Sequence, residues 1–307
     1  MIRTTPPVSI FGVPTDIGAS RRGASMGPEA LRVAGLVEAI AARGIEVHDI
    51  GDVQGPRNPI SAPVDGYRHL EEVVAWNRAV FDASERELRA GRMPIMLGGD
   101  HCLAIGSIAA VAAHCRAQGK SLRVLWLDAH ADFNTSDITP SGNIHGMPVA
   151  CLCGLGPDAL TQLGGPAPQM HPHQFRQIGI RSVDPEEKRL VKQHGVDIYD
   201  MRYIDEIGMK RVMEHALAGV DADTHLHVSF DVDFLDPGIA PGVGTTVPGG
   251  PNYREAQLAM EMIADSGRMG SLDIVELNPV LDNRNMTAEL AVDLVESLFG
   301  KSTLMRD

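Results

Sequence analysis

Two acidic clusters stand out in the sequence because each follows a strand-like apolar run. The first consists of Asp128, His130 and Asp132, and the second of Asp231 and Asp233. Side chains of an extended chain alternate between its two faces, so the members of each cluster should point the same way. Four carboxylates and an imidazole brought together would repel one another unless cations lay between them. The clusters therefore predict a site for two hard divalent cations.

Two further candidates lie where other strands are expected to end, namely His101 after the turn Gly98-Gly99, and Glu276. Taken alone, an Asp-x-Asp pair is usually a loop or capping feature, and a lone histidine is usually packed or solvated. All these residues are expected at one sheet edge, and this joint pattern favours a metal site. Four aspartates and two histidines suit Mn²⁺ better than Zn²⁺, which prefers more nitrogen and sulfur. A bridging aspartate would hold two ions about 3.5 Å apart, and a water between them would lose a proton near neutral pH.

The segments that must position these residues alternate between strand-like and helix-like patterns. We expect eight strands, at 8–11, 45–50, 93–97, 122–127, 174–180, 196–199, 226–230 and 272–277. We expect helices at 27–43, 70–90, 204–217, 254–263 and 287–299, one ending at Cys115 and one beginning near Pro185. Strands separated by helices predict a parallel sheet with helices on both faces, in a single α/β domain over residues 1–307. Ligands bind such sheets beyond the carboxyl ends of the strands, where the candidates lie.

Composition excludes several classes of partner. The 307 residues carry a formal charge of −13, which argues against nucleic acid or an anionic membrane as the main partner. No apolar run reaches the roughly 18 residues of a membrane span. The four cysteines, Cys102, Cys115, Cys151 and Cys153, are too few for a disulfide scaffold and indicate free thiols in a reducing compartment. A strand expected from Val8 leaves no room for a signal peptide, so we expect a cytoplasmic protein.

Three segments resemble the signatures of the ureohydrolases, dimanganese enzymes that hydrolyse guanidino groups. They are Gly98-Gly99-Asp100-His101, Asp128-Ala129-His130-Ala131-Asp132, and the stretch from Ser229 to Pro237. Matching segments run from position 8 to position 300. The resemblance implies a three-layer α/β/α fold with an eight-stranded parallel sheet, in agreement with the pattern of segments. Within the family the chain is most similar to bacterial-type arginase, because Asn134, Ser141 and their neighbours match arginase residues that hold the substrate α-carboxylate.

The resemblance also implies a ligand set for two Mn²⁺ ions per subunit. The first ion would be held by four residues, His101, Asp128, Asp132 and Asp231. The second would be held by His130, Asp128, Asp231 and Asp233. Asp128 and Asp231 would bridge the two ions. A hydroxide between the ions would attack the guanidinium carbon of L-arginine, giving L-ornithine and urea.

Further roles carry over from the same resemblance. His145 matches the proton-shuttling histidine and Glu276 the carboxylate that orients the guanidinium, and Asp128 or Asp132 would carry a proton toward the leaving amine. The implied substrate-binding residues are Asn134, Ser141, Asn143, Asp184, Glu187, Thr245 and Glu276. Cys102, Phe234 and Ser182 depart from the commoner family residues, and the last two could change substrate affinity.

Other ureohydrolase activities remain open at this point, on agmatine, guanidinobutyrate or formiminoglutamate, as does a non-catalytic metal-binding relative. Asn134 and Ser141 argue against agmatine, which has no α-carboxylate. An intact ligand set together with His145 and Glu276 argues against a non-catalytic protein. The resemblance further implies a homo-oligomer, a trimer or a hexamer, acting on a small-molecule substrate.

Overall fold

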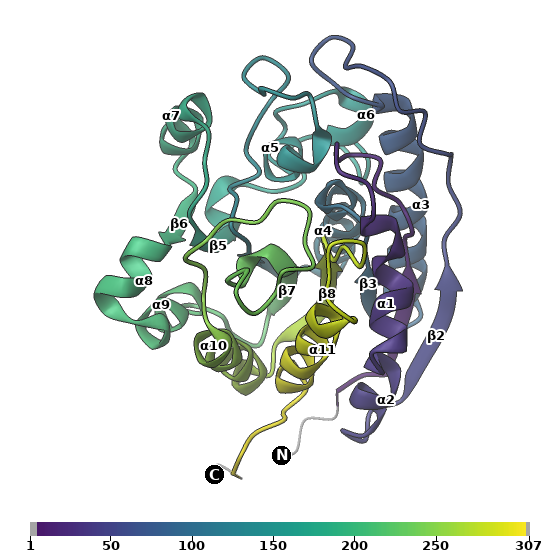
Figure 1. Ribbon diagram of the computed structural model, residues 1–307. Helices are drawn as coiled ribbons and strands as arrows, with labels where there is room; N and C mark the ends of the chain where they lie inside the picture. The colour runs from purple at the N-terminus through teal and green to yellow at the C-terminus, as the bar shows by residue number, and fades with distance from the viewer. Residues whose placement is uncertain (1–4, 305–307) are drawn as a thin grey trace.

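A single parallel sheet organises the computed structural model, which describes residues 5–304 (Figure 1). Its strands are β1 (Val8–Gly12), β2 (Val47–Asp52), β3 (Met93–Leu97), β4 (Ser121–Leu127), β5 (Phe175–Ile180), β6 (Asp197–Asp200), β7 (Thr224–Asp231) and β8 (Met269–Val275). Within the described residues the strand order is β2-β1-β3-β8-β7-β4-β5-β6, and every pairing is parallel. The predicted eight-stranded parallel sheet is confirmed.

Helices cover both faces of this sheet. They are α1 (Gly27–Val33), α2 (Leu36–Ala41), α3 (Leu70–Arg89), α4 (Ala104–Gln118), α5 (Pro148–Leu152), α6 (Asp158–Thr161), α7 (Pro185–His194), α8 (Met201–Ile207), α9 (Met209–Ala216), α10 (Tyr253–Ser266) and α11 (Met286–Leu298). One buried core joins the sheet to α1, α2 and α8–α11, and two others join it to α3–α7. The three-layer arrangement is therefore confirmed as well.

Two of the expected helices are each divided at a glycine. The helix expected over 27–43 breaks at Gly35 (φ 85°), and the one expected over 204–217 breaks at Gly208 (φ 82°). A left-handed or otherwise positive φ cannot continue an α-helix, and glycine adopts it without a Cβ clash. Apolar periodicity continues across both glycines, so the pattern alone did not reveal the breaks.

Strand β7 shows how the sheet separates an apolar face from a polar one. Leu226, Val228 and Phe230 are fully buried in the core shared with α10 and α11. The alternate residues 225, 227, 229 and 231 are His, His, Ser and Asp, and all are buried on the other face. This polar row leads along β7 to the carboxyl edge of the sheet. No helix of the described residues is long and apolar enough to cross a membrane.

Candidate metal centre and substrate cleft

Four adjacent strands in the middle of the sheet deliver the candidate ligands to one edge. Strands β3, β8, β7 and β4 are neighbours in that order. His101 lies on the 3₁₀ turn η2 (His101–Leu103) after β3, Asp128 follows β4, and Asp231 is the last residue of β7. Because all four strands are parallel, residues more than 100 positions apart in sequence converge here.

The first group of ligand atoms surrounds the Nδ1 atom of His101. This atom lies 3.0 Å from Asp128 Oδ2, 3.1 Å from Asp231 Oδ2 and 3.3 Å from Asp132 Oδ2. It is buried and makes no hydrogen bond with any of the residues that the structure describes. His101, Asp128 and Asp231 can offer one ligand atom each within a sphere fit for a metal ion. An imidazole nitrogen left without a partner among carboxylate oxygens fits a cation at their centre.

The second group shares Asp128 with the first. His130 Nδ1 lies 3.4 Å from Asp128 Oδ1 and 3.1 Å from Asp233 Oδ2, and these three residues also form a possible metal site. The two oxygens of Asp128 thus face different histidines. The close group around Asp231 contains His101 but not His130. The arrangement fits a binuclear centre in which Asp128 would help to hold both ions.

The backbone does not follow the extended path that the spacing predicted. Asp132 has a left-handed conformation (φ 49°), and Asp233 lies on the 3₁₀ turn η5 (Val232–Phe234). Asp231 caps this turn, because its Oδ1 accepts the backbone N–H of Asp233 at 2.7 Å. The prediction that the aspartates converge is met, but a left-handed residue at Asp132 and a 3₁₀ turn at Asp233 bring them inward, and side-chain alternation does not.

Burial and neighbouring charges shift the pKa of the clustered groups in opposite directions. Burial, reinforced by other carboxylates, raises the pKa of Asp132 and Asp231 well above the usual range. Burial acts the same way on Asp128, but His101 and His130 outweigh it and lower its pKa. Burial opposes protonation of these two histidines, yet the carboxylates raise their pKa. Without metal the cluster therefore retains protons that bound cations would displace.

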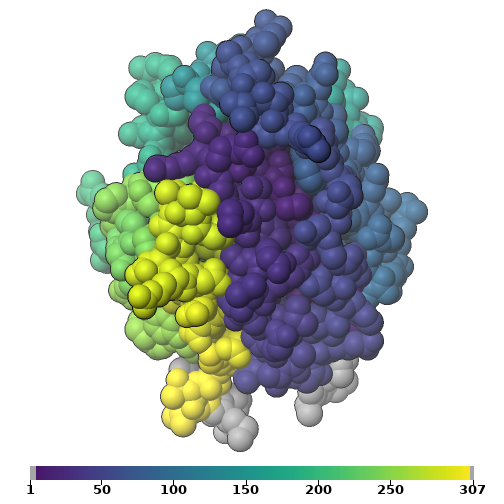
Figure 2. Space-filling model, turned by 45° about the vertical axis from the view of Figure 1, so that its right-hand side comes forward, coloured from purple at the N-terminus to yellow at the C-terminus, as the bar shows by residue number. Residues whose placement is uncertain are grey.

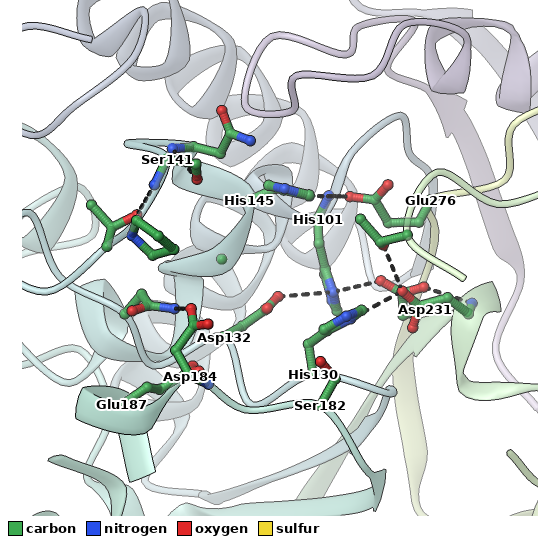
Figure 3. A pocket seen from close by; sticks show the side chains of 17 residues that line it. His101, His130, Asp132, Ser141, His145, Ser182, Asp184, Glu187, Asp231 and Glu276 are labelled. Carbon is green, nitrogen blue, oxygen red and sulfur yellow. Dashed lines mark hydrogen bonds and ion pairs between the residues drawn. The ribbon is translucent and has the colours of Figure 1, made fainter. Parts of the chain in front are cut away.

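Glu276 and His145 form a second polar unit above the cluster (Figure 3). His145 Nδ1 lies 2.9 Å from Glu276 Oε1, and the same oxygen accepts the backbone N–H of His101 at 2.9 Å. Glu276 is buried and has a left-handed backbone (φ 62°), a conformation disfavoured for residues with a Cβ. Burial opposes protonation of His145, but Glu276 outweighs it and raises its pKa.

The cluster lies at the bottom of a cavity of about 240 Å³. Every residue predicted to bind substrate lines it: Asn134, Ser141, Asn143, Asp184, Glu187, Thr245 and Glu276. Figure 3 shows Ser141, Asp184 and Glu187 on one side of the cavity, and Asp231 and Glu276 on the other. A linear substrate can therefore place one end near the metal ligands and the other near these polar residues.

Hydrogen bonds distinguish the lining residues by what they already bind. Asn134 Nδ2 donates to Asp184 Oδ2 at 3.1 Å, while its buried Oδ1 has no hydrogen-bond partner between residues 5 and 304. Both oxygens of Glu187 accept backbone N–H groups, those of Phe133 (2.8 Å) and Asp184 (3.0 Å). Thr245 Oγ1 donates to the ligand oxygen Asp233 Oδ2 at 2.9 Å. Glu187 and Thr245 thus hold other site residues in place, in addition to lining the cavity.

Comparison with known proteins identifies the family. The model of the arginase family matches residues 6–300. The curated arginase of Bacillus caldovelox is 45% identical over 301 residues, covering 97% of this chain and 99% of that protein. The chain belongs to the arginase family. The curated arginase of Brucella melitensis is 47% identical over 301 residues, 97% of each chain. A solved structure of the B. caldovelox arginase matches the fold with a TM-score of 0.92 at 44% identity, covering 98% of this chain and 100% of that chain.

The three departures from commoner arginase-family residues have different surroundings. Cys102 is fully buried in the core that joins α3 to the sheet. Phe234 packs edge-on against Phe230, and a Cβ on Gly179 (φ 93°) would lie 2.5 Å from its ring. Ser182 lines the cavity and forms a parallel β-bridge with His130. Only Ser182 is thus placed to contact a ligand in the cavity.

Several residues that contact the arginase-family ligands were not predicted. The Trp126 ring stacks on His101 at 3.9 Å, and its Nε1 donates to Asp128 Oδ2 at 2.9 Å. Ser229 Oγ lies 2.8 Å from His101 Nε2, so Nδ1 is the nitrogen that could bind a metal ion. Trp126 and Ser229 each precede a ligand aspartate by two residues in a strand, so strand alternation could have revealed both. Arg181, whose side chain donates to backbone oxygens throughout the described residues, left no comparable signal.

Proposed function

We propose that the protein hydrolyses L-arginine to L-ornithine and urea at a centre of two Mn²⁺ ions. One observation carries this proposal: two groups of candidate ligand atoms share Asp128, and their other members line one polar cavity. The curated relatives named above, arginases at 45% and 47% identity over almost the whole chain, support the same reaction. Oxygen-rich ligation with two imidazoles favours Mn²⁺ over Zn²⁺.

Two bound ions would supply Lewis-acid stabilisation and a water molecule of lowered pKa for attack on the guanidinium carbon. The chain itself must hold the substrate. Glu276 is buried beside the cluster, and its Oε1 is already fixed by His101 N–H and His145. Its second oxygen is therefore oriented to accept a hydrogen bond from a guanidinium group. A charge-assisted hydrogen bond of this kind orients the carbon for attack.

His145 is placed to move protons rather than to bind metal. It lies on the 3₁₀ turn η3 (Ile144–Gly146), outside the two groups of metal ligands, and lines the cavity. Its hydrogen bond to Glu276 favours the protonated imidazole, so it can donate a proton toward the leaving amine. We further propose that Asp132 takes part in this proton transfer, since its carboxylate also lines the cavity.

The opposite side of the cavity would read the amino-acid end of arginine. Asn134, Ser141 and Asn143 offer amide and hydroxyl donors for an α-carboxylate. Asp184, whose Oδ2 is held by Asn134, offers a carboxylate for the α-amino group. These donors favour arginine over agmatine, which lacks the α-carboxylate and would leave them unpaired.

A substrate panel with chelator-stripped and Mn²⁺-loaded protein tests the proposal. We expect urea from arginine only after Mn²⁺ is restored, with far slower reaction of agmatine, guanidinobutyrate and formiminoglutamate. Faster turnover of another panel member would assign the chain to that activity. Full activity of thoroughly metal-free protein would refute the metal-dependent mechanism, and inactivity on the whole panel would favour a non-catalytic role.

Assembly and location complete the proposal. We propose a trimer or hexamer of identical chains in the cytoplasm, in line with the family resemblance and the free cysteines. Light scattering of the purified protein would measure the assembly, and a monomer at working concentration would contradict it.

A further inference from the structure

Arg181 directs its side chain entirely at backbone carbonyl groups. It follows β5, and its guanidinium makes six hydrogen bonds of 2.8–3.2 Å to the oxygens of Gly179, residues 233–235 and Val247. A planar guanidinium offers five N–H donors in a fixed arrangement. Here that arrangement joins three separate stretches of backbone.

One of these stretches carries a residue of the second metal group, and another lies beside a residue that supports it. The carbonyls of residues 233–235 belong to η5 and the residue after it, so the side chain of Arg181 holds the turn that presents Asp233. Val247 lies two residues beyond Thr245, whose hydroxyl donates to Asp233 Oδ2. Arg181 therefore fixes the backbone of the ligand and the loop that supplies its hydrogen-bond donor.

The main chain of Arg181 holds the other side of the same site. Its N–H donates to the carbonyl oxygen of Ala129 at 2.8 Å, and the N–H of Ser182 donates to the same oxygen at 3.0 Å. Ala129 directly precedes His130, which pairs with Ser182 in a β-bridge. His130 and Asp233 are the two ligands that belong only to the second group. Both are thus tied to one residue.

Within the first group, His101 and Asp132 are held by other contacts, whereas Asp231 meets the turn held by Arg181 through the N–H of Asp233. His101 is fixed by Ser229 and by Glu276, and the carbonyl of Asp132 accepts the N–H of Val149 at 3.1 Å. None of these contacts involves Arg181. A disturbance at Arg181 should therefore reach the second group before the first.

We propose that Arg181 is a positioning residue for the second metal site, setting the separation of His130 and Asp233. The inference rests on the binuclear centre proposed above. The guanidinium of Arg181 packs closely against Gly250. A Cβ at that position would lie 2.6 Å from Arg181 Nη2, so the absence of a side chain there makes room for the arginine. Asp236 closes the same loop by accepting the N–H groups of Gly249 (2.7 Å) and Gly250 (3.2 Å).

The test is calorimetric titration of chelator-stripped protein with Mn²⁺, comparing wild type, Arg181→Met and Arg181→Lys. Loss of contacts that orient metal ligands typically weakens metal binding about 10–100-fold. We expect that loss for the second equivalent in Arg181→Met and a smaller loss in Arg181→Lys, whose ammonium keeps the charge but only three donors. The first equivalent should stay within about threefold of wild type, well below that range.

Arg176→Lys is the matched control. Arg176 lies on β5, near the end away from Arg181, and its Nη1 also donates to backbone carbonyls, those of His173 (2.7 Å) and Phe175 (2.9 Å), besides its ion pair with Asp197, which lysine can keep. This control should lower the melting temperature without changing either metal affinity. Wild-type affinity for both equivalents in Arg181→Met, or equal weakening of both, would overturn the inference.

A second variant keeps the test decisive if Arg181→Met does not fold. Gly250→Ala keeps the Arg181 residue but places a Cβ 2.6 Å from its Nη2 and 2.8 Å from the backbone nitrogen of Asp236, so the guanidinium and this part of the loop must shift together. Selective weakening of the second equivalent would again support the inference, and unchanged binding would overturn it. Should the wild-type protein bind fewer than two equivalents, the binuclear centre itself fails, which is a different result from a failure of Arg181 alone.

Discussion

Asp128 is the residue at which the two groups of metal ligands meet, because its two oxygens face different histidines. We expect Asp128→Asn to hold fewer than two ions per chain and to lose most of its activity, since one change weakens both sites. Metal analysis after gel filtration measures this. Asp137→Asn, an exposed change in the following loop, should keep both ions. Two tightly held ions in Asp128→Asn would refute the bridging role.

His145 should act on protons and not on ions. We predict that His145→Asn binds Mn²⁺ with wild-type stoichiometry but turns over arginine about 10²–10⁴-fold more slowly, the usual contribution of a general acid or base. Steady-state kinetics and metal analysis on the same sample check both parts. Loss of metal from this variant would instead make His145 a structural residue of the centre.

Asn134 and Ser141 should decide between arginine and agmatine. Replacing both with alanine should lower kcat/KM for arginine roughly 10²-fold or more, at about 1.5–3 kcal/mol for each hydrogen bond to a charged group. Agmatine hydrolysis, slow to begin with, should change little. Ser136→Ala, in the same loop but outside the cavity lining, is the control. If the ratio of the two specificity constants does not move, the carboxylate is bound elsewhere.

The sequence predicted which side chains form the site better than it predicted the backbone conformations that carry them. The spacing of the aspartates and histidines predicted which residues meet, and the structure brings them together. It did not predict the left-handed backbone of Asp132 or the turn that carries Asp233. Both depend on hydrogen bonds formed only in the folded chain. The role of Arg181 was not predicted for the same reason. Its partners are backbone carbonyl groups, which every residue has, so they leave no pattern in the sequence.

At the scale of helices and strands, Glu87 joins helix α3 to the edge of the sheet where the strands begin, opposite the edge that carries the metal ligands. Its buried carboxylate accepts hydrogen bonds from Ser9 Oγ on β1 and from Arg92 just before β3. Burial would raise its pKa, but Arg92, Arg86 and Ser9 outweigh this and hold the pKa below its ordinary value of 4.5. Because the pKa of Glu87 is lower in the folded protein than in the unfolded chain, its ionised carboxylate stabilises the fold at any pH above the unfolded pKa. That stabilisation is lost as the pH falls through the folded pKa.

We therefore predict that Glu87→Gln lowers the free energy of unfolding by about 1.5–3 kcal/mol at neutral pH. The difference from wild type should shrink as pH falls below 4.5. Urea denaturation at a series of pH values measures it. Glu85→Gln, which removes only the exposed pair with Arg89, should cost less than about 1 kcal/mol. A pH-independent difference for Glu87→Gln would show that packing, and not charge, explains the loss.

Elements were predictable where the pattern was local. Strand β3 was predicted with its observed bounds, and the other strands to within about three residues at each end. The order of the strands was not predicted, because pairing joins segments far apart in sequence and leaves no local mark. The two divided helices were predicted wrongly although the signal was local. Gly35 and Gly208 stand in the sequence as possible helix breaks, but the apolar periodicity across them favoured continuous helices.

Over the whole molecule, the metal-free protein should become less stable as pH rises from about 5 to 8. Burial raises the pKa of Asp132 and Asp231, and raises that of Asp100 to about 6, so the folded state keeps protons that the unfolded chain releases. The raised pKa of His101 and His130 acts in the same direction, because their stabilisation is lost as pH rises through the folded values.

Bound ions should reverse this trend, since their ligands must be deprotonated and metal affinity grows with pH. Melting temperatures with chelator and with Mn²⁺, each measured across that pH range, test the prediction. A metal-free protein whose melting temperature rose with pH would contradict it.

The first and last parts of the chain meet on one face of the molecule. Figure 2 shows α1 in purple beside α11 in yellow, and Asn285, just before α11, donates to the carbonyl of Ala30 on α1 at 3.0 Å. Beneath them β8, the last strand made, lies between β3 and β7 in the middle of the sheet. Until the ribosome has released residues 269–275, β2-β1-β3 and β7-β4-β5-β6 share no hydrogen-bonded edge. His101 and its carboxylate partners belong to different halves of that unfinished sheet, so we expect the first metal group to assemble only after β8 has been made, whereas Asp128, His130 and Asp233 all lie on the β7-β4 half.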